Sequence, residues 1–134
     1  MDEIGKELRG RNILIVDDDA RNMFALVSYL EDMEMNLRTA GDGFGAIELL
    51  ACYGDIEMIL MDMMMPGMDG FETIARVRNN PSTAHIPIIA LTAKAMKGDR
   101  AKCLEAGATE YVSKPIQMRE LLEKMTGMLN LVQK

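Results

Sequence analysis

The sequence has few of the features that mark secreted, membrane-spanning or metal-thiolate proteins. Its two cysteines, Cys52 and Cys103, stand in no CxxC or metal-like spacing, so we interpret them as ordinary thiols of a reducing compartment. No apolar stretch is long enough to cross a bilayer, and Met1–Asn12 is polar and charged, without the apolar region of a signal peptide. We therefore expect a cytoplasmic location and no membrane contact.

Basic residues and histidine are also scarce. Fifteen Lys and Arg residues against 21 acidic residues give a net charge of -6, so a broad basic surface is not expected. This balance disfavours nucleic acid and anionic membranes as partners. The single histidine, His85, has no second metal-type residue beside it, and we interpret it as a surface or turn residue.

The composition is that of one folded domain. Apolar residues make up 49% of the 134 positions and charged residues 27%, which supports a buried core and excludes a disordered chain. No repeat, low-complexity segment or internal linker divides the sequence. We expect a polar leader over residues 1–10 and one domain over residues 11–134. Methionine is abundant, with 14 residues, and its densest cluster is interpreted as core packing: Met58, Met61, Met63, Met64, Met65 and Met68.

Short apolar runs alternate with stretches of helical periodicity. The runs predict strands at 13–16, 58–61 and 86–91, a more polar edge strand at 37–40, and a fifth strand at 111–112. Pro87 is expected at the start of its strand, where the missing N–H does no harm. Helices are predicted after Asp19 as N-cap, at 44–53, from about residue 69 with Phe71, Ile74 and Ala75 inward, at 95–106 before Gly107, and from about residue 117.

This alternation predicts an α/β fold. Five strands that alternate with five helices form a parallel sheet covered on both faces. Right-handed crossovers restrict the topology to a doubly wound order such as 2-1-3-4-5. We expect a (βα)5, flavodoxin-like sandwich with this order.

Polar residues directly follow four of the predicted strands, where sheets of this kind bind their ligands. They are Asp17, Asp18 and Asp19 after the first strand, Asp62 after the third, Thr92 after the fourth, and Ser113 and Lys114 after the fifth. Clustered carboxylates need a hard cation, and oxygen ligands point to Mg²⁺. A metal, a lysine and a hydroxyl together can neutralise a phosphoryl group. The set therefore predicts a site at which Asp62 acts as a nucleophile and becomes an aspartyl phosphate.

Four segments resemble the receiver domain of two-component response regulators. They are Ile13–Asp18, Met61–Gly70, Leu91–Lys97 and Tyr111–Pro115, in the same order and register over about residues 11–132. Within that family, the flanking sequences are most similar to receivers of hybrid histidine kinases, and single-domain relay regulators share some of these features. The resemblance implies a phosphoacceptor signalling domain rather than an enzyme, whose partner is a histidine kinase or a histidine phosphotransfer protein.

The resemblance also implies a role for individual residues. Asp62 would be the phosphoacceptor, with Mg²⁺ bound by Asp18, Asp62 and the Met64 carbonyl, and by Asp17 through a water. Thr92, Lys114 and the backbone of Ala93 would hold the phosphoryl oxygens, and Thr92 and Tyr111 would switch the face formed by the fourth helix, fifth strand and fifth helix. A cis bond before Pro115 is expected from the turn that aims Lys114, and the resemblance implies the same.

Two positions depart from frequent patterns of that family. Met64 stands two residues after Asp62, and Lys94 two residues after Thr92. A thioether is a poor hydrogen-bond partner for an attacking water, and an ammonium offers only donors. We therefore expect the aspartyl phosphate to hydrolyse slowly.

Two other functions remain open from the residues alone. A haloacid-dehalogenase-type phosphohydrolase also uses Asp, Thr or Ser, Lys and Mg²⁺, but it needs a further acid pair and usually a cap domain. A passive protein-binding module is disfavoured by the intact Asp62, Thr92 and Lys114. The sequence does not decide between a stand-alone protein and part of a larger hybrid kinase.

Overall fold

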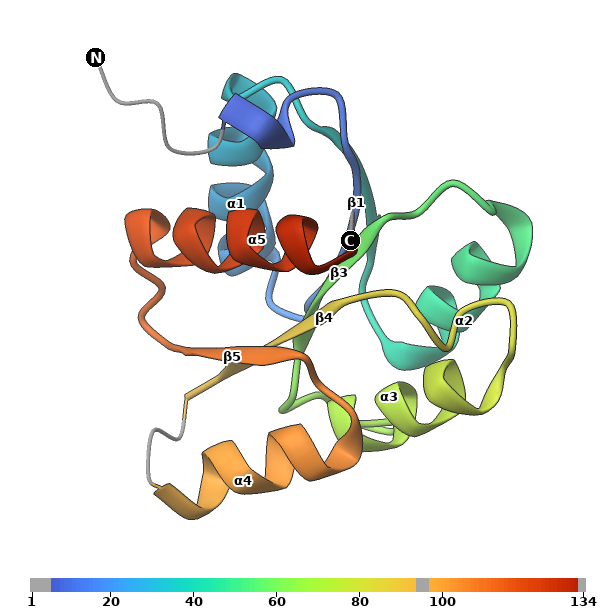
Figure 1. Ribbon diagram of the computed structural model, residues 1–134. Coiled ribbons are helices and arrows are strands. Elements are labelled where there is room, and N and C mark those ends of the chain that lie inside the picture. Colours follow the sequence, from blue (N-terminus) through green and yellow to red (C-terminus); the bar gives the residue numbers. More distant parts are fainter. Residues whose placement is uncertain (1–5, 94–96, 133–134) are drawn as a thin grey trace.

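The computed structural model describes residues 6–93 and 97–132, which form a parallel sheet covered by helices on both faces (Figure 1). Five strands lie in the order β2-β1-β3-β4-β5, as predicted. The strands are β1 (Asn12–Val16), β2 (Asn36–Ala40), β3 (Met58–Asp62), β4 (Ile88–Thr92) and β5 (Glu110–Ser113). The helices are the 3₁₀ turn η1 (Lys6–Leu8), α1 (Ala20–Asp32), α2 (Gly43–Cys52), α3 (Gly70–Asn79), α4 (Lys97–Ala106) and α5 (Met118–Val132).

The helices form two layers with a core on each side of the sheet. Helices α1 and α5 cover one face, and α2, α3 and α4 cover the other (Figure 1). The central strand β3 is buried along its whole length and serves both cores. Its Ile59 and Met61 pack toward α2–α4, whereas Met58 and Leu60 pack toward α1 and α5. Strand β2 pairs only with β1 and is the edge strand that its polar sequence predicted.

Aspartate caps start three of the helices at the end of the sheet where the strands finish. Asp19, Asp42 and Asp69 precede α1, α2 and α3, and each carboxylate accepts a first-turn backbone N–H at 2.7–2.9 Å. The cap predicted at Asp19 is therefore confirmed. Asp19 is not one of the three carboxylates that lie close together in the described chain, which are Asp17, Asp18 and Asp62.

The buried face of α3 differs from the predicted one. Ile74 is buried as expected, but Phe71 is only half-buried and Ala75 is exposed, so the inward placement of Ala75 is wrong. The position is taken by Thr73, whose buried hydroxyl donates to the Asp69 carbonyl at 2.7 Å. A polar side chain that satisfies its own hydrogen bond can occupy the core, which apolar periodicity does not reveal.

Two boundaries are also shifted. Strand β4 begins at Ile88, two residues later than predicted, so Pro87 lies directly before the strand. Helix α4 is described from Lys97 onward, and residues 95 and 96 of the predicted helix lie outside the described residues. Gly107 follows the last helical residue with φ +117°, in agreement with the predicted left-handed end of that helix.

The cluster of methionines is mostly core, as expected. Met58, Met61, Met63, Met65 and Met68 are buried, whereas Met64 is exposed. In the predicted polar leader, the described residues include η1, and Leu8 is fully buried in the core beside α5. Within the described ranges, no helix combines the length and the apolarity needed to cross a membrane.

Candidate functional site

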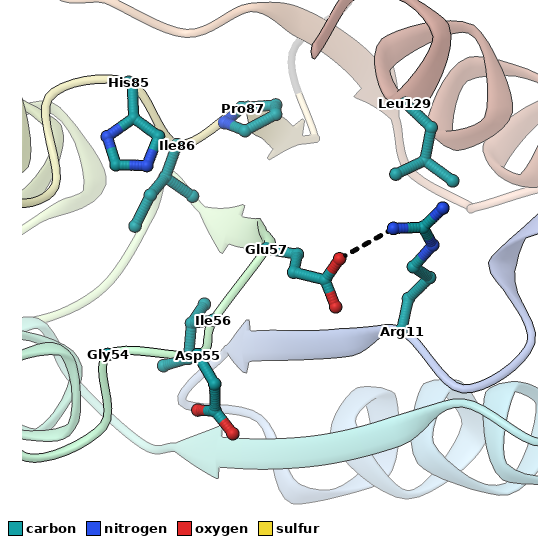
Figure 2. Close-up of a pocket in the computed structure, with 9 residues that line it drawn as sticks. All are labelled: Arg11, Gly54, Asp55, Ile56, Glu57, His85, Ile86, Pro87 and Leu129. Atoms are coloured by element: carbon teal, nitrogen blue, oxygen red, sulfur yellow. Dashed lines mark hydrogen bonds and ion pairs between the residues drawn. The ribbon is translucent and has the colours of Figure 1, made fainter. Parts of the chain in front are cut away.

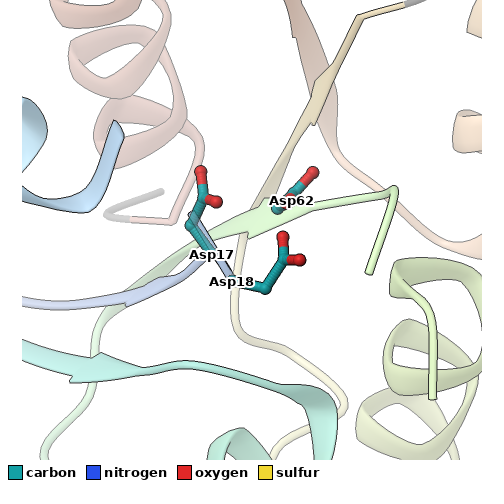
Figure 3. A group of neighbouring side chains, drawn as sticks. All are labelled: Asp17, Asp18 and Asp62. Carbon is teal, nitrogen blue, oxygen red and sulfur yellow. The ribbon is translucent and has the colours of Figure 1, made fainter. Parts of the chain in front are cut away.

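Three carboxylates meet where β1 and β3 end. Asp17 and Asp18 directly follow β1, and Asp62 is the last residue of β3. The two strands are adjacent and parallel, with Val16 in register with Met61, so the residues after them lie side by side. One oxygen from each of the three carboxylates lies within 4.8 Å of the others (Figure 3). The sequence prediction of one acidic cluster at the strand ends is therefore correct for these three residues.

The cluster is partly withdrawn from solvent. Asp17 and Asp62 are each 2% exposed, whereas Asp18 is exposed. Asp17 Oδ1 accepts the Asp19 N–H at 2.8 Å, and Asp62 Oδ1 accepts the Met64 N–H at 3.1 Å. The second oxygen of Asp17, Oδ2, is buried and accepts no hydrogen bond from the described residues. A buried carboxylate oxygen without a hydrogen bond is costly unless a cation or a water compensates it.

Lys114 supplies a positive charge to the cluster. Its Nζ lies 3.3 Å from Asp62 Oδ1 and 3.5 Å from Asp17 Oδ2. The Lys114 N–H donates to the Thr92 carbonyl at 2.7 Å, which fixes the backbone of this residue at the end of the sheet. The Lys114–Pro115 peptide bond is cis. Lys114 thus links the end of β5 to β4 and spans the buried carboxylates.

The site keeps an excess of negative charge. Among the described residues, one ammonium faces the three carboxylates. The pKa of Asp18 is raised, first by desolvation and then by its hydrogen bond with Asp62 and the negative charge of that residue. Hard divalent cations prefer such oxygen ligands, and Mg²⁺ is commonly bound by one or two carboxylates with water completing its shell. The donor set, which includes a buried Asp17 oxygen that accepts no hydrogen bond from the described residues, therefore fits Mg²⁺.

The end of β4 completes the rim. Thr92 is the last residue of β4, is 4% exposed, and lies in register with Ser113 of β5. Ala93 follows it and is exposed, while Lys94 lies outside the described residues. The structure therefore brings Thr92 and Lys114 to the same edge of the sheet as the acidic cluster, as the spacing of strand ends predicted.

Gly70 is a site-positioning residue that the sequence reasoning missed. It begins α3, and its N–H donates to the Met63 carbonyl at 3.3 Å. A Cβ at this position would lie 2.6 Å from Met63 Cα and 2.7 Å from the Asp62 carbonyl oxygen. Only glycine lets α3 pack this closely against the backbone that carries Asp62. The feature of the sequence that could have indicated this role is a glycine directly after the N-cap residue Asp69.

This arrangement has known counterparts. The family model of the response regulator receiver domain matches residues 13–126. The chain belongs to this family. Membership makes it a receiver domain of two-component systems, a phosphoacceptor signalling domain, and sets aside the haloacid-dehalogenase alternative.

Curated relatives are longer proteins that carry a similar domain. The response regulator PleD of Caulobacter vibrioides is 41% identical over 105 residues, which are 78% of this chain and 23% of PleD. The sensor histidine kinase GacS of Pseudomonas protegens is 33% identical over 126 residues, which are 90% of this chain and 14% of GacS. The chain thus spans less than a quarter of these relatives, and the similarity concerns their receiver-like part.

Solved receiver domains have the same fold. The receiver domain of the sensor histidine kinase PA1611 from Pseudomonas aeruginosa, with a magnesium ion in its active-site cleft, has a TM-score of 0.77 at 33% identity and covers 87% of this chain and 93% of that one. The receiver domain of Ssk1 from Saccharomyces cerevisiae, in complex with the phosphotransfer protein Ypd1, has a TM-score of 0.81 at 28% identity and covers 89% and 88%.

Tyr111 of this receiver domain has two cations near its ring. It is half-buried in β5, with the Arg100 guanidinium of α4 5.7 Å and the Lys124 ammonium of α5 5.3 Å from its ring centroid. Lys124 also donates to the Tyr111 carbonyl at 2.9 Å and pairs with Glu110 at 3.3 Å. Neither contact with Tyr111 was predicted from the sequence, because each joins two elements that are separate in the chain.

A pocket of about 250 Å³ lies at the opposite end of the sheet, before β1, β3 and β4 (Figure 2). It contains the ion pair between Arg11 and Glu57, at 2.9 Å, and Glu57 also accepts the Asn12 N–H at 3.0 Å. This carboxylate therefore joins the starts of β1 and β3. His85 is exposed at the rim, consistent with a surface role.

Proposed function

We propose that this receiver domain accepts a phosphoryl group on Asp62 with the help of Mg²⁺. The observation that carries the proposal is that, among the described residues, three carboxylates meet around one ammonium and a buried oxygen of Asp17 accepts no hydrogen bond. Asp18, Asp62 and the Met64 carbonyl would hold the metal, with Asp17 acting through a water. Bound Mg²⁺ would supply the positive charge that lets an anionic carboxylate approach a phosphoryl group.

The residues of the chain divide the remaining work. A carboxylate oxygen of Asp62 attacks the phosphorus, and the bond from phosphorus to the donor nitrogen breaks, with its electron pair leaving on the donor. The Lys114 ammonium, now spread between Asp17 and Asp62, would pair with a phosphoryl oxygen. The Thr92 hydroxyl and the Ala93 backbone N–H would donate to the others. Each of these groups stabilises charge that the transferred group carries.

Transfer would then change the face formed by α4, β5 and α5. Movement of the Thr92 hydroxyl toward the phosphoryl group would vacate space that Tyr111 can fill. Since Tyr111 contacts cations of α4 and α5, its rotation would alter both helices. A local charge event would thereby bias a two-state element.

The proposed donor is a phosphohistidine of a histidine kinase or of a phosphotransfer protein. Supporting this are the similarity to GacS and PA1611, both sensor histidine kinases, and to Ssk1, which was solved with the phosphotransfer protein Ypd1. The domain would act in the cytoplasm, alone or within a longer hybrid kinase. No chemistry beyond its own phosphorylation and dephosphorylation is proposed.

The test is labelling with acetyl phosphate, with and without Mg²⁺, followed by intact-mass spectrometry. We expect wild type to gain one phosphoryl group only with Mg²⁺, and Asp62→Asn and Asp18→Ala to gain none. Asp55→Asn, which removes an exposed acid at the opposite end of the sheet, is the matched control and should label like wild type. Labelling of Asp62→Asn at the wild-type rate would overturn the proposal.

A further inference from the structure

The loop between β3 and α3 carries four methionines with very different exposure. Met63, Met65 and Met68 are 1%, 6% and 2% exposed, whereas Met64 is 55% exposed. Among the methionines whose side chains the structure describes, every other one is buried or half-buried. Met64 is therefore the methionine of this loop that is most accessible to a water-soluble oxidant.

Met64 is also joined to the phosphoacceptor. It stands two residues after Asp62, and its N–H donates to Asp62 Oδ1 at 3.1 Å. The Asp62 side chain is itself only 3% exposed. A change in the chemistry of the Met64 side chain would therefore occur on a residue whose backbone N–H the Asp62 carboxylate already accepts.

We propose that Met64 is an oxidation site through which peroxide shortens the lifetime of the phosphoryl group on Asp62. The proposal rests on the function proposed above. The Met64 sulfur attacks one oxygen of hydrogen peroxide, the O–O bond breaks with its electron pair on the other oxygen, and that oxygen leaves as hydroxide. The hydroxide takes the proton from the oxygen now bound to sulfur, which gives a sulfoxide and water. Sulfur loses two electrons and becomes a sulfoxide, and the peroxide is reduced.

The consequence follows from the change in hydrogen bonding. A thioether is at best a weak acceptor, whereas a sulfoxide oxygen is a polar acceptor. An acyl phosphate is hydrolysed by a water that must be oriented toward the phosphorus, and an acceptor beside the site can hold that water. Oxidised Met64 thus provides an acceptor that the reduced side chain lacks. Methionine sulfoxide reductases reverse the modification, so the effect is a switch.

The first measurement is the order of oxidation. The purified chain is treated with graded hydrogen peroxide, and the sulfoxide at each methionine is quantified by peptide mass spectrometry. We expect Met64 to be converted well before Met63, Met65 and Met68. Conversion of these buried neighbours at the same rate as Met64 would overturn the proposal.

The second measurement is the phosphoryl half-life after acetyl phosphate is removed, in protein with and without prior oxidation. One added hydrogen bond to the attacking water predicts a decrease of about fivefold in wild type. Met64→Leu should show no oxidation-dependent change, whereas Met33→Leu, a half-buried methionine at the end of α1, should respond like wild type. Treatment with the reductases should restore the longer half-life.

The outcomes separate the two proposals. A wild-type half-life that stays constant while Met64 is fully oxidised, or an equal decrease in Met64→Leu, would overturn the oxidation switch and leave the proposed function standing. If reduced wild type takes up no phosphoryl group at all, the proposed function fails, and with it the switch, whatever the order of oxidation.

Discussion

Removal of the Lys114 ammonium should destabilise the metal-free protein more than any exposed lysine does. Lys114 pairs with Asp62 at 3.3 Å and with Asp17 at 3.5 Å, and these two carboxylates have side chains that are 3% and 0% exposed. At these separations an effective dielectric constant of about 20 gives roughly 5 kcal/mol for each attraction, before desolvation is subtracted. Breaking a buried pair by removing one partner typically costs about 3–5 kcal/mol, because the remaining charge is left uncompensated. We therefore expect Lys114→Met to lower the free energy of unfolding by about 3 kcal/mol.

The assay is urea unfolding followed by far-ultraviolet circular dichroism at low salt, in EDTA and in excess Mg²⁺. Lys102→Met, which removes an exposed ammonium from α4, is the control and should change stability by less than about 0.5 kcal/mol. Mg²⁺ should reduce the difference in the free energy of unfolding between Lys114→Met and wild type, because a bound cation neutralises the same carboxylates. A loss below about 1 kcal/mol for Lys114→Met in EDTA would refute this account of the charge balance.

Three further outcomes follow from single contacts. Gly70→Ala should destabilise the protein by about 1–3 kcal/mol, because the added methyl group would overpack against Asp62 and Met63. Gly41→Ala should not destabilise it, because the space around Gly41 is open. Equal urea midpoints for the two variants would contradict this prediction. Arg78 donates to the carbonyls of Gly107, Ala84 and Ile86 at 2.6–2.9 Å, so Arg78→Ala should lower the free energy of unfolding by about 2–4 kcal/mol. In the same unfolding assay, Arg76→Ala, which removes an exposed ion pair, should lower it by about 0.3–0.5 kcal/mol. Because the pKa of Asp18 is raised in the fold, its contribution to stability is present below the ordinary value of 3.8 and is lost as pH rises through the raised pKa. The free energy of unfolding of metal-free Asp18→Asn should therefore exceed that of wild type at pH 7 by less than about 1 kcal/mol, and this difference should disappear in acid. A difference that stays constant across pH would argue against this explanation.

Much of the fold and the candidate site could be predicted because both depend on patterns that are local in the sequence. The buried runs of β1, β3 and β4 are apolar on both faces, which predicts a parallel sheet, and the crossover rule restricts that sheet to doubly wound strand orders. The same topology brings the residue after each strand to one edge. Asp17, Asp18, Asp62 and Lys114 were therefore found from position alone.

The remaining features depend on contacts that a sequence does not display. Thr73 can be buried because its hydroxyl donates a hydrogen bond to the Asp69 carbonyl. Thr73 therefore lies on the buried face of α3, and Ala75 lies on the exposed face. Lys124 reaches Tyr111 across two elements, and Gly70 is required by the approach of α3 to the backbone of Asp62. Each is a matter of distance between segments, and periodicity carries no information about it.

The central claim, that Asp62 is the phosphoacceptor, is tested most directly by trapping the acyl phosphate. Sodium borohydride reduces an aspartyl phosphate to homoserine and leaves free aspartate unchanged, so the residue that carried the phosphoryl group is marked permanently. After phosphorylation with acetyl phosphate and Mg²⁺, peptide mass spectrometry should locate homoserine at position 62 and at neither Asp17 nor Asp18. Homoserine at either of those two positions, or none in a protein that has gained phosphoryl mass, would contradict the account.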